Sequence, residues 1–176
     1  MRFVSTRGGA PASAAQAIQE GLHPDGGLYV PAAFPALSVG EIAGLGGLRY
    51  ADRAAAVLGR YLTDFSPADL RAMCEAAYAR FDPAGVAPLR ALSGRTWAME
   101  LWHGPTLAFK DVALTLLPGL MAAAGKALGD DRELVILAAT SGDTGKAALE
   151  GFMDAPGAQC VVFYPEGGVS EAQRLQ

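Results

Sequence analysis

Apolar positions recur at helical spacing through the first half of the chain, whereas the second half carries unbroken apolar runs. Between residues 70 and 78, the stripe of leucine, methionine, cysteine, alanine and tyrosine falls on one face of a helix. Stripes of this kind are typical of helices that pack on a hydrophobic core. We therefore predict a mostly helical N-terminal subdomain over residues 1–88.

Serine residues mark the expected starts of three helices in this part. Ser13 precedes the first, and Ser38 is followed three residues later by Glu41, which matches a capping box. Ser66 is followed by Pro67, which combines a cap residue with a proline in the first helical turn. Helix starts are therefore predicted at these serines.

A segment rich in proline and glycine, residues 81–88, separates the helical part from a region in which strands and helices alternate. This alternation predicts right-handed crossovers and a parallel sheet, with the run 134–139 buried on both faces. The expected elements are strands at 96–102, 134–139 and 160–164, and helices at 110–128, with a kink near Pro118, and at 144–153. The predicted fold class is α/β, with the first part of a three-layer parallel-sheet domain over residues 89–176.

Two features indicate that this α/β domain is incomplete. Ser170 begins a helix that stops at Gln176, and about three strands are few for such a sheet. An exposed apolar strand edge favours aggregation. We therefore expect a truncated enzyme, with self-association through the exposed sheet edge or a partner that covers it.

Composition excludes several classes of protein. Hydrophobic residues make up 51%, and a net charge of −4 argues against nucleic-acid binding. The first residues lack the apolar core of a signal peptide, and the stretch 112–128 contains Pro118 and Lys126, short of the roughly 18 apolar residues of a membrane span. Cys74 and Cys160 have no spacing typical of a metal site or a disulfide framework. We expect a cytoplasmic protein with no nucleic-acid, membrane or metal partner.

Lys110 lies where the strand at 96–102 has ended and a helix begins. A cation at a helix start is disfavoured by up to about 1 kcal/mol, and the apolar neighbours 107–109 further disfavour the charged amine. A neutral amine is the form that attacks an aldehyde to make a Schiff base. An isolated lysine would be an ordinary surface residue, but within the turn phrase 103–111 we favour a catalytic amine, since active sites collect at the carboxyl ends of parallel strands.

A second phrase, residues 141–145, lies between an apolar strand and the next helix. Its glycines allow close backbone approach, and its amides and hydroxyls suit a carboxylate or phosphate. The same turn could instead serve only to cap the helix. Its members are Ser141, Gly142, Asp143, Thr144 and Gly145.

Three other motifs are excluded because the residues that they require are missing. A Walker loop would need glycine and Ser/Thr where Thr140 and Ala147 stand. The Gly-x-Gly-x-x-Gly of a dinucleotide site is absent. A nucleophile elbow at Ser141 would need glycines at Ala139 and Asp143, so a triad of Ser141 with His103 and Asp143 is disfavoured.

Together these phrases resemble threonine synthase, a pyridoxal-phosphate enzyme family with the tryptophan-synthase-β-like fold (fold type II). The resemblance runs along nearly all of the chain. It is carried by residues 26–31 (GGLYVP), 103–111 (HGPTLAFKD), 139–145 (ATSGDTG) and 164–165 (YP). The lysine phrase and the glycine phrase are specific in combination.

The resemblance implies that O-phosphohomoserine and water are converted to L-threonine and phosphate, the last step of threonine biosynthesis. Lys110 would hold pyridoxal phosphate as an internal aldimine and later move protons, with Thr106 nearby. The loop Ser141 to Gly145 would contact the cofactor, and Ser141 and Thr144 the substrate. The turn 166–168 is acidic where the family often carries basic residues, so we assign substrate phosphate to Lys146 instead.

The family's cofactor-phosphate loop and its partner for the pyridine nitrogen lie beyond Gln176, so we expect little turnover from this chain alone. Two alternatives remain open. One is a related pyridoxal-phosphate phospholyase or another β/γ-eliminating lyase. The other is a non-catalytic module that has kept the fold, against which the presence of Lys110 argues.

Overall fold

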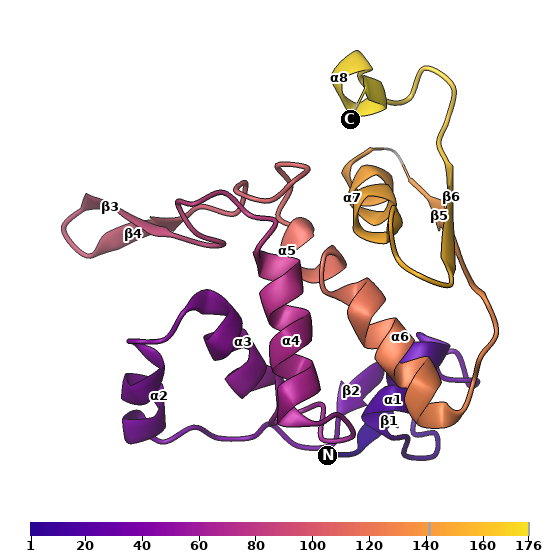
Figure 1. Cartoon of the computed structure of the whole chain (residues 1–176), viewed down its shortest axis with the longest axis horizontal. Helices are drawn as coiled ribbons and strands as arrows, with labels where there is room; N and C mark the ends of the chain where they lie inside the picture. Colours follow the sequence, from indigo (N-terminus) through magenta and orange to yellow (C-terminus); the bar gives the residue numbers. More distant parts are fainter. Residues whose placement is uncertain (141, 176) are drawn as a thin grey trace. The chain divides into compact units, whose positions relative to one another are not determined.

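The computed structural model describes residues 1–140 and 142–175 (Figure 1). The chain forms two compact units. The first consists of Met1–Glu75 and Gly119–Asp131, and the second of Ala76–Pro118 and Arg132–Gln176. The predicted domain boundary near residue 88 stays a prediction, because compactness alone does not define a domain.

The first unit combines helices with one small antiparallel sheet. Strand β1 (Phe3–Ser5) pairs with β2 (Tyr29–Pro31). The helices are α1 (Ala14–Glu20), α2 (Val39–Leu45), α3 (Tyr50–Leu58), most of α4 (Pro67–Tyr78) and most of α6 (Leu117–Leu128). Its core consists of buried residues from several of these helices and the α3–α4 connection: Ala14, Ala15, Leu62, Phe65, Leu70 and Ala124. The mostly helical character is as predicted.

The predicted serine caps are confirmed. Ser13 and Ser38 each accept a hydrogen bond from the backbone amide three residues on, and each closes a full capping box. The Oγ of Ser66 accepts from the amide of Asp69 at 3.1 Å. Each serine satisfies an amide that a helix start otherwise leaves unpaired.

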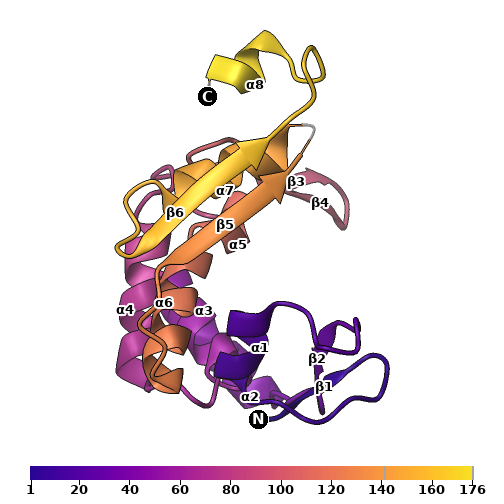
Figure 2. The same ribbon diagram turned by 90° about the vertical axis from the view of Figure 1, so that its right-hand side faces the viewer.

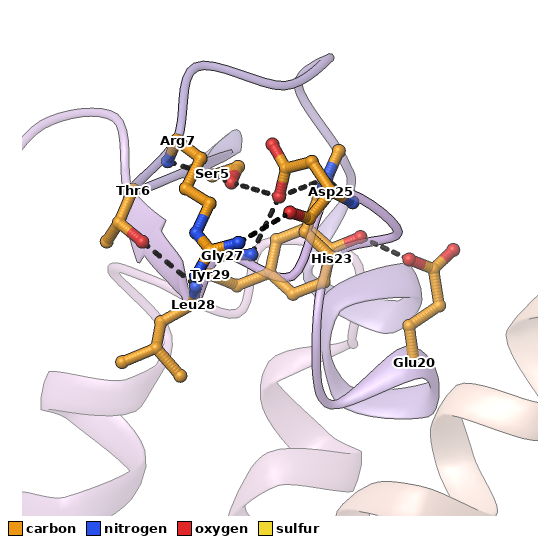
Figure 3. A network of polar contacts seen from close by, with 9 residues as sticks. All are labelled: Ser5, Thr6, Arg7, Glu20, His23, Asp25, Gly27, Leu28 and Tyr29. Atoms are coloured by element: carbon orange, nitrogen blue, oxygen red, sulfur yellow. Dashed lines mark hydrogen bonds and ion pairs between the residues drawn. The ribbon is translucent and has the colours of Figure 1, made fainter.

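A polar network joins the end of β1 to the turn before β2 (Figure 3). The Asp25 Oδ1 accepts hydrogen bonds from Ser5 Oγ at 2.8 Å and from the Gly27 amide at 2.7 Å, and lies 2.9 Å from His23 Nδ1. Arg7 donates to the Asp25 carbonyl at 3.1 Å. The network therefore fixes the turn that follows α1.

The second unit begins with a hairpin that the sequence did not predict. Strands β3 (Leu89–Ser93) and β4 (Thr96–Met99) pair antiparallel, with Leu89 opposite Met99. The prediction that the strand at 96–102 belongs to a parallel sheet is therefore wrong. Its nearest partner in sequence lies across a short turn, and such a turn permits only antiparallel pairing.

A parallel pair forms the rest of the sheet structure. Strand β5 (Leu134–Ala139) pairs in register with β6 (Ala158–Phe163), and α7 (Asp143–Phe152) connects them (Figure 2). The prediction that β5 is buried on both faces is wrong. Its residues alternate between half-buried and exposed, with Leu137 69% exposed. Helix α7 covers one face, and the other face is apolar and open.

The expected helix 110–128 is two helices. A short α5 (Asp111–Leu114) ends at Leu114, and α6 begins at Leu117 with Pro118 in its first turn, where a proline costs no hydrogen bond. By length and composition alone the stretch Asp111–Leu128 could cross a membrane, but about a quarter of it (28%) is buried within this protein. The last helix, α8 (Glu171–Leu175), is capped by Ser170 as predicted.

Candidate active site

Lys110 lies at the edge of an apolar hollow in the second unit. It is half-buried, and its Nζ stands 4.3 Å from the centroid of the Phe109 ring. The hollow measures about 470 Å³, within the size range of small-molecule sites. Besides Lys110 it is lined by Leu101, Phe109, Val112, Ala113, Leu114 and Thr144. The described walls of this hollow are thus mostly apolar.

The helix after Lys110 is shorter than the sequence predicted. Because α5 spans only four residues, its dipole is weaker than that of a continuous helix over 110–128. The positive end of a helix dipole therefore contributes less at Lys110 than the sequence suggested.

The loop before Lys110 is closed by Asp111. Its carboxylate accepts two hydrogen bonds from Thr106, one from the backbone amide to Oδ2 at 2.8 Å and one from the hydroxyl to Oδ1 at 2.5 Å. Asp111 is 1% exposed and Thr106 is 4% exposed. Thr115 also donates its hydroxyl to the Asp111 carbonyl at 2.7 Å. The sequence singled out Thr106 as a cofactor contact, whereas the structure gives its hydroxyl proton a partner inside the protein.

The side chain of Thr140 stabilises the glycine loop, residues 141–145, through hydrogen bonds to two of its amides. The amides of Gly142 and Gly145 donate to the Thr140 Oγ1 at 3.1 and 3.3 Å. Gly145 is buried so tightly that a Cβ there would stand 2.3 Å from Thr140 Cγ2 and 2.7 Å from Val162 Cγ1. Ser141, a predicted contact of cofactor and substrate, lies outside the described residues. Close packing therefore accounts for Gly145 independently of any ligand.

Thr144 is the member of the predicted loop that lines the same hollow as Lys110. The neighbouring Asp143 points elsewhere: its Oδ1 lies 3.6 Å from the Lys146 Nζ and accepts from the Gln173 side chain at 3.2 Å. Lys146 lines a second, smaller hollow of about 100 Å³ together with Arg174. The structure thus brings Lys110 and Thr144 together and places Lys146 at a different opening.

His103 is part of a charged cluster that the sequence did not reveal. Its Nε2 lies 2.8 Å from Glu100 Oε2, and the Arg90 Nε donates to Glu100 Oε1 at 3.1 Å. The hydrogen bond with His103 and the charge of Arg90 lower the pKa of the Glu100 carboxyl. His103 is therefore held by its contact with Glu100. Among residues 1–140 and 142–175, no group of three or more His, Cys, Asp or Glu side chains could hold a metal ion.

Comparison with known proteins shows what the chain is similar to. A family model described as threonine synthase N terminus matches residues 2–78. The chain is 43% identical to threonine synthase of Pseudomonas aeruginosa over 178 aligned positions, which cover 100% of this chain and 38% of that protein. It matches the N-terminal part of the threonine synthase family. The resemblance inferred from the sequence is confirmed.

Solved threonine synthase structures share the backbone arrangement. A PLP-bound threonine synthase from Brucella melitensis matches with a TM-score of 0.92 and 38% identity, over 98% of this chain and 37% of that chain. Human threonine synthase-like 1 is 44% identical over 92% of this chain and 22% of its own length. The chain thus spans about two fifths of the length of the threonine synthases it matches.

Proposed function

We propose that this chain is the N-terminal part of a pyridoxal-phosphate-dependent threonine synthase that converts O-phosphohomoserine and water to threonine and phosphate. The observation that supports the proposal most strongly is the placement of Lys110. It stands beside Thr144 at an apolar hollow, in a backbone that follows a PLP-bound threonine synthase with a TM-score of 0.92.

The residues around the hollow fit the cofactor. A primary amine can bind an aldehyde covalently, and the apolar walls suit a flat aromatic ring. Thr144 contributes to the lining of the same hollow. When bound, pyridoxal phosphate would draw electrons from the substrate's α-carbon and so make its protons removable.

Lys110 would have two tasks in this reaction. Its amine would attach the aldehyde of the cofactor. Lys110 would also accept and return protons at the substrate carbons. The adjacent ring of Phe109, 4.3 Å from Nζ, limits the directions that the amine can take.

The chain by itself should turn over little substrate. It spans 38% of the Pseudomonas aeruginosa relative, so most of the residues of such an enzyme lie outside it. We expect covalent attachment of the cofactor to be the first property that can be tested on the 176-residue chain.

A second candidate is a related pyridoxal-phosphate phospholyase that uses the same lysine. Human threonine synthase-like 1, whose name sets it apart from threonine synthase itself, is 44% identical over 92% of this chain, so the similarity alone does not select the first candidate. The two differ in product, because only threonine synthesis adds water at the β-carbon. Measuring both phosphate release and threonine formation from O-phosphohomoserine, with a full-length protein, separates them.

The test of the proposal is cofactor trapping. The chain is incubated with pyridoxal phosphate, reduced with borohydride, digested, and mapped by mass spectrometry. We expect label on Lys110, loss of that label in Lys110→Ala, and no change in Lys126→Ala, which alters an exposed lysine on α6. If the full-length protein also leaves Lys110 unlabelled, the enzyme proposal fails and the non-catalytic alternative is favoured.

A further inference from the structure

The loop that leads to Lys110 is closed by hydrogen bonds between its two ends. At one end Thr106 donates its amide and hydroxyl, and at the other Asp111 receives both on a single carboxylate. Two backbone hydrogen bonds tighten the loop further. The Leu107 amide donates to the Gly104 carbonyl at 3.1 Å, and the Asp111 amide donates to the Ala108 carbonyl at 3.0 Å.

Leu107 shows that this closure constrains the backbone. Its φ of 60° makes it the one non-glycine residue with positive φ among residues 1–140 and 142–175. Side chains with a Cβ branch point or bulk resist this conformation, so the surrounding contacts must impose it. The Leu107 side chain is 64% exposed, so its own packing is a weak restraint. The Thr106–Asp111 contacts on either side are the evident restraint.

We propose that Asp111 is a positioning residue for Lys110. By holding Thr106 through both donors, it keeps the 106–111 loop in one shape and so sets the direction of the amine that precedes it by one residue. The inference rests on the proposed function in one respect: it takes Lys110 to be the amine that attaches the cofactor.

The chemistry of the contact favours this role over simple helix stabilisation. A carboxylate that is 1% exposed must find hydrogen-bond donors, and Asp111 receives two from the same residue, Thr106. Asp111 thereby fixes both the backbone position and the side-chain rotamer of Thr106. An asparagine would present an NH₂ group to one of these donors, so Asp111→Asn keeps the shape of the side chain and removes one acceptor.

The test compares four variants of the 176-residue chain: Asp111→Asn, Thr106→Val, Thr106→Ser and, as a matched control, Asp154→Asn at an exposed carboxylate. Thr106→Val removes the hydroxyl donor, and Thr106→Ser restores it. The first readout is hydrogen exchange of the amides at 106–111. The second is the rate at which acetic anhydride modifies Lys110 relative to the exposed Lys126 in the same molecule, which needs no cofactor.

We expect Asp111→Asn and Thr106→Val each to speed hydrogen exchange at the backbone amide of residue 106 by about tenfold, which is the effect of one lost hydrogen bond. In both variants the Lys110-to-Lys126 modification ratio should move toward one, while Thr106→Ser and Asp154→Asn should keep the original ratio. If Asp111→Asn does not fold, the Thr106→Val and Thr106→Ser pair decides the matter.

Two results would overturn the positioning role. One is faster exchange at Thr106 with an unchanged modification ratio, because the contact would then hold the loop but not the lysine. The other is failure of Thr106→Ser to restore the ratio, which would assign the effect to the threonine methyl group. Cofactor trapping on the full-length protein keeps the two proposals apart: a shifted ratio in the variants without attachment of the cofactor to Lys110 in the full-length protein contradicts the proposed function alone.

Discussion

Gly104 lies directly against Asp111: a Cβ at position 104 would stand 2.5 Å from both the Cβ and the Oδ2 of Asp111. Gly104→Ala must therefore push the buried carboxylate off Thr106, and we expect the free energy of unfolding to fall by roughly 1–3 kcal/mol. Urea denaturation measures this. The control is Gly40→Ala in α2, where a Cβ would meet nothing within 4 Å. Equal stability of the two variants would contradict the close packing.

Leu107 offers the opposite test, because its backbone conformation suits glycine. Leu107→Gly should leave stability unchanged or raise it by up to about 1 kcal/mol, since it relieves a left-handed φ and removes a side chain that is 64% exposed. Thermal unfolding measures the effect. The comparison is Leu149→Gly, at an exposed helical position in α7, which should cost about 1 kcal/mol. A loss in Leu107→Gly as large as in the comparison would show that the strain is absent.

Tyr29 gives a prediction at high pH. Its hydroxyl donates to Glu20, and this hydrogen bond raises the pKa of Tyr29 to about 12. The folded protein thus holds the phenolic proton more tightly than the unfolded chain does. The resulting stabilisation is present below the ordinary value of 10.0 and is lost as pH rises through about 12.

Tyrosinate absorbance during an alkaline titration tests this assignment. Tyr29→Phe should remove a component that titrates near pH 12, and Glu20→Gln should move that component down toward 10.0. Tyr164→Phe serves as the control, since it should leave that component in place. A Glu20→Gln curve that overlays the wild type would rule out the Glu20 contact as the cause.

Lys146 is the residue assigned to the substrate phosphate, and it lines a different hollow from Lys110. In a full-length enzyme, Lys146→Ala should raise the KM for O-phosphohomoserine about tenfold while kcat changes little, because a charge-assisted contact made before and during the reaction is lost. Steady-state phosphate release measures both constants. Lys126→Ala is the charge-matched control. A fall in kcat at unchanged KM would remove Lys146 from substrate binding.

The open face of the β5–β6 sheet predicts self-association of this chain. Leu137 and Phe163 are 69% and 60% exposed on a parallel pair, and parallel sheets are ordinarily covered on both faces. Sedimentation velocity should show association that increases with concentration, and Leu137→Thr with Phe163→Thr should reduce it several-fold. Leu92→Thr, which removes an exposed leucine from the hairpin, should not. A wild-type chain that stays monomeric would contradict the prediction.

Local signals in the sequence predicted local structure well. The serine caps at Ser13, Ser38, Ser66 and Ser170 were correct because a cap depends on residues within one helical turn. The β3–β4 hairpin was missed because all the residues of β3 are exposed, so it carries no buried face to impose alternation. The error about β5 has another cause. An apolar run indicates that both faces of a strand favour burial. It does not indicate whether the helices or strands that would cover those faces belong to the same chain.

The candidate site divides in the same way. Lys110 and the loop that contains Thr144 could be proposed as site residues from their sequence motifs. The structure places these two residues at one hollow. The closure of the loop could not be found, because a carboxylate that follows a lysine at a helix start has an ordinary explanation in the helix dipole. Only the positions of both Thr106 donors distinguish the two roles of Asp111.

The path of the chain through the first unit has a consequence for the order of folding. A Cβ at Gly119 would meet Met73 at 3.2 Å, and Ala124 is buried in the same core as Ala14. During synthesis that core must wait for α6, by which time the intervening stretch with Lys110 has already been made. Contacts so distant in sequence close slowly. The lysine loop therefore leaves the ribosome before the first unit can complete its core.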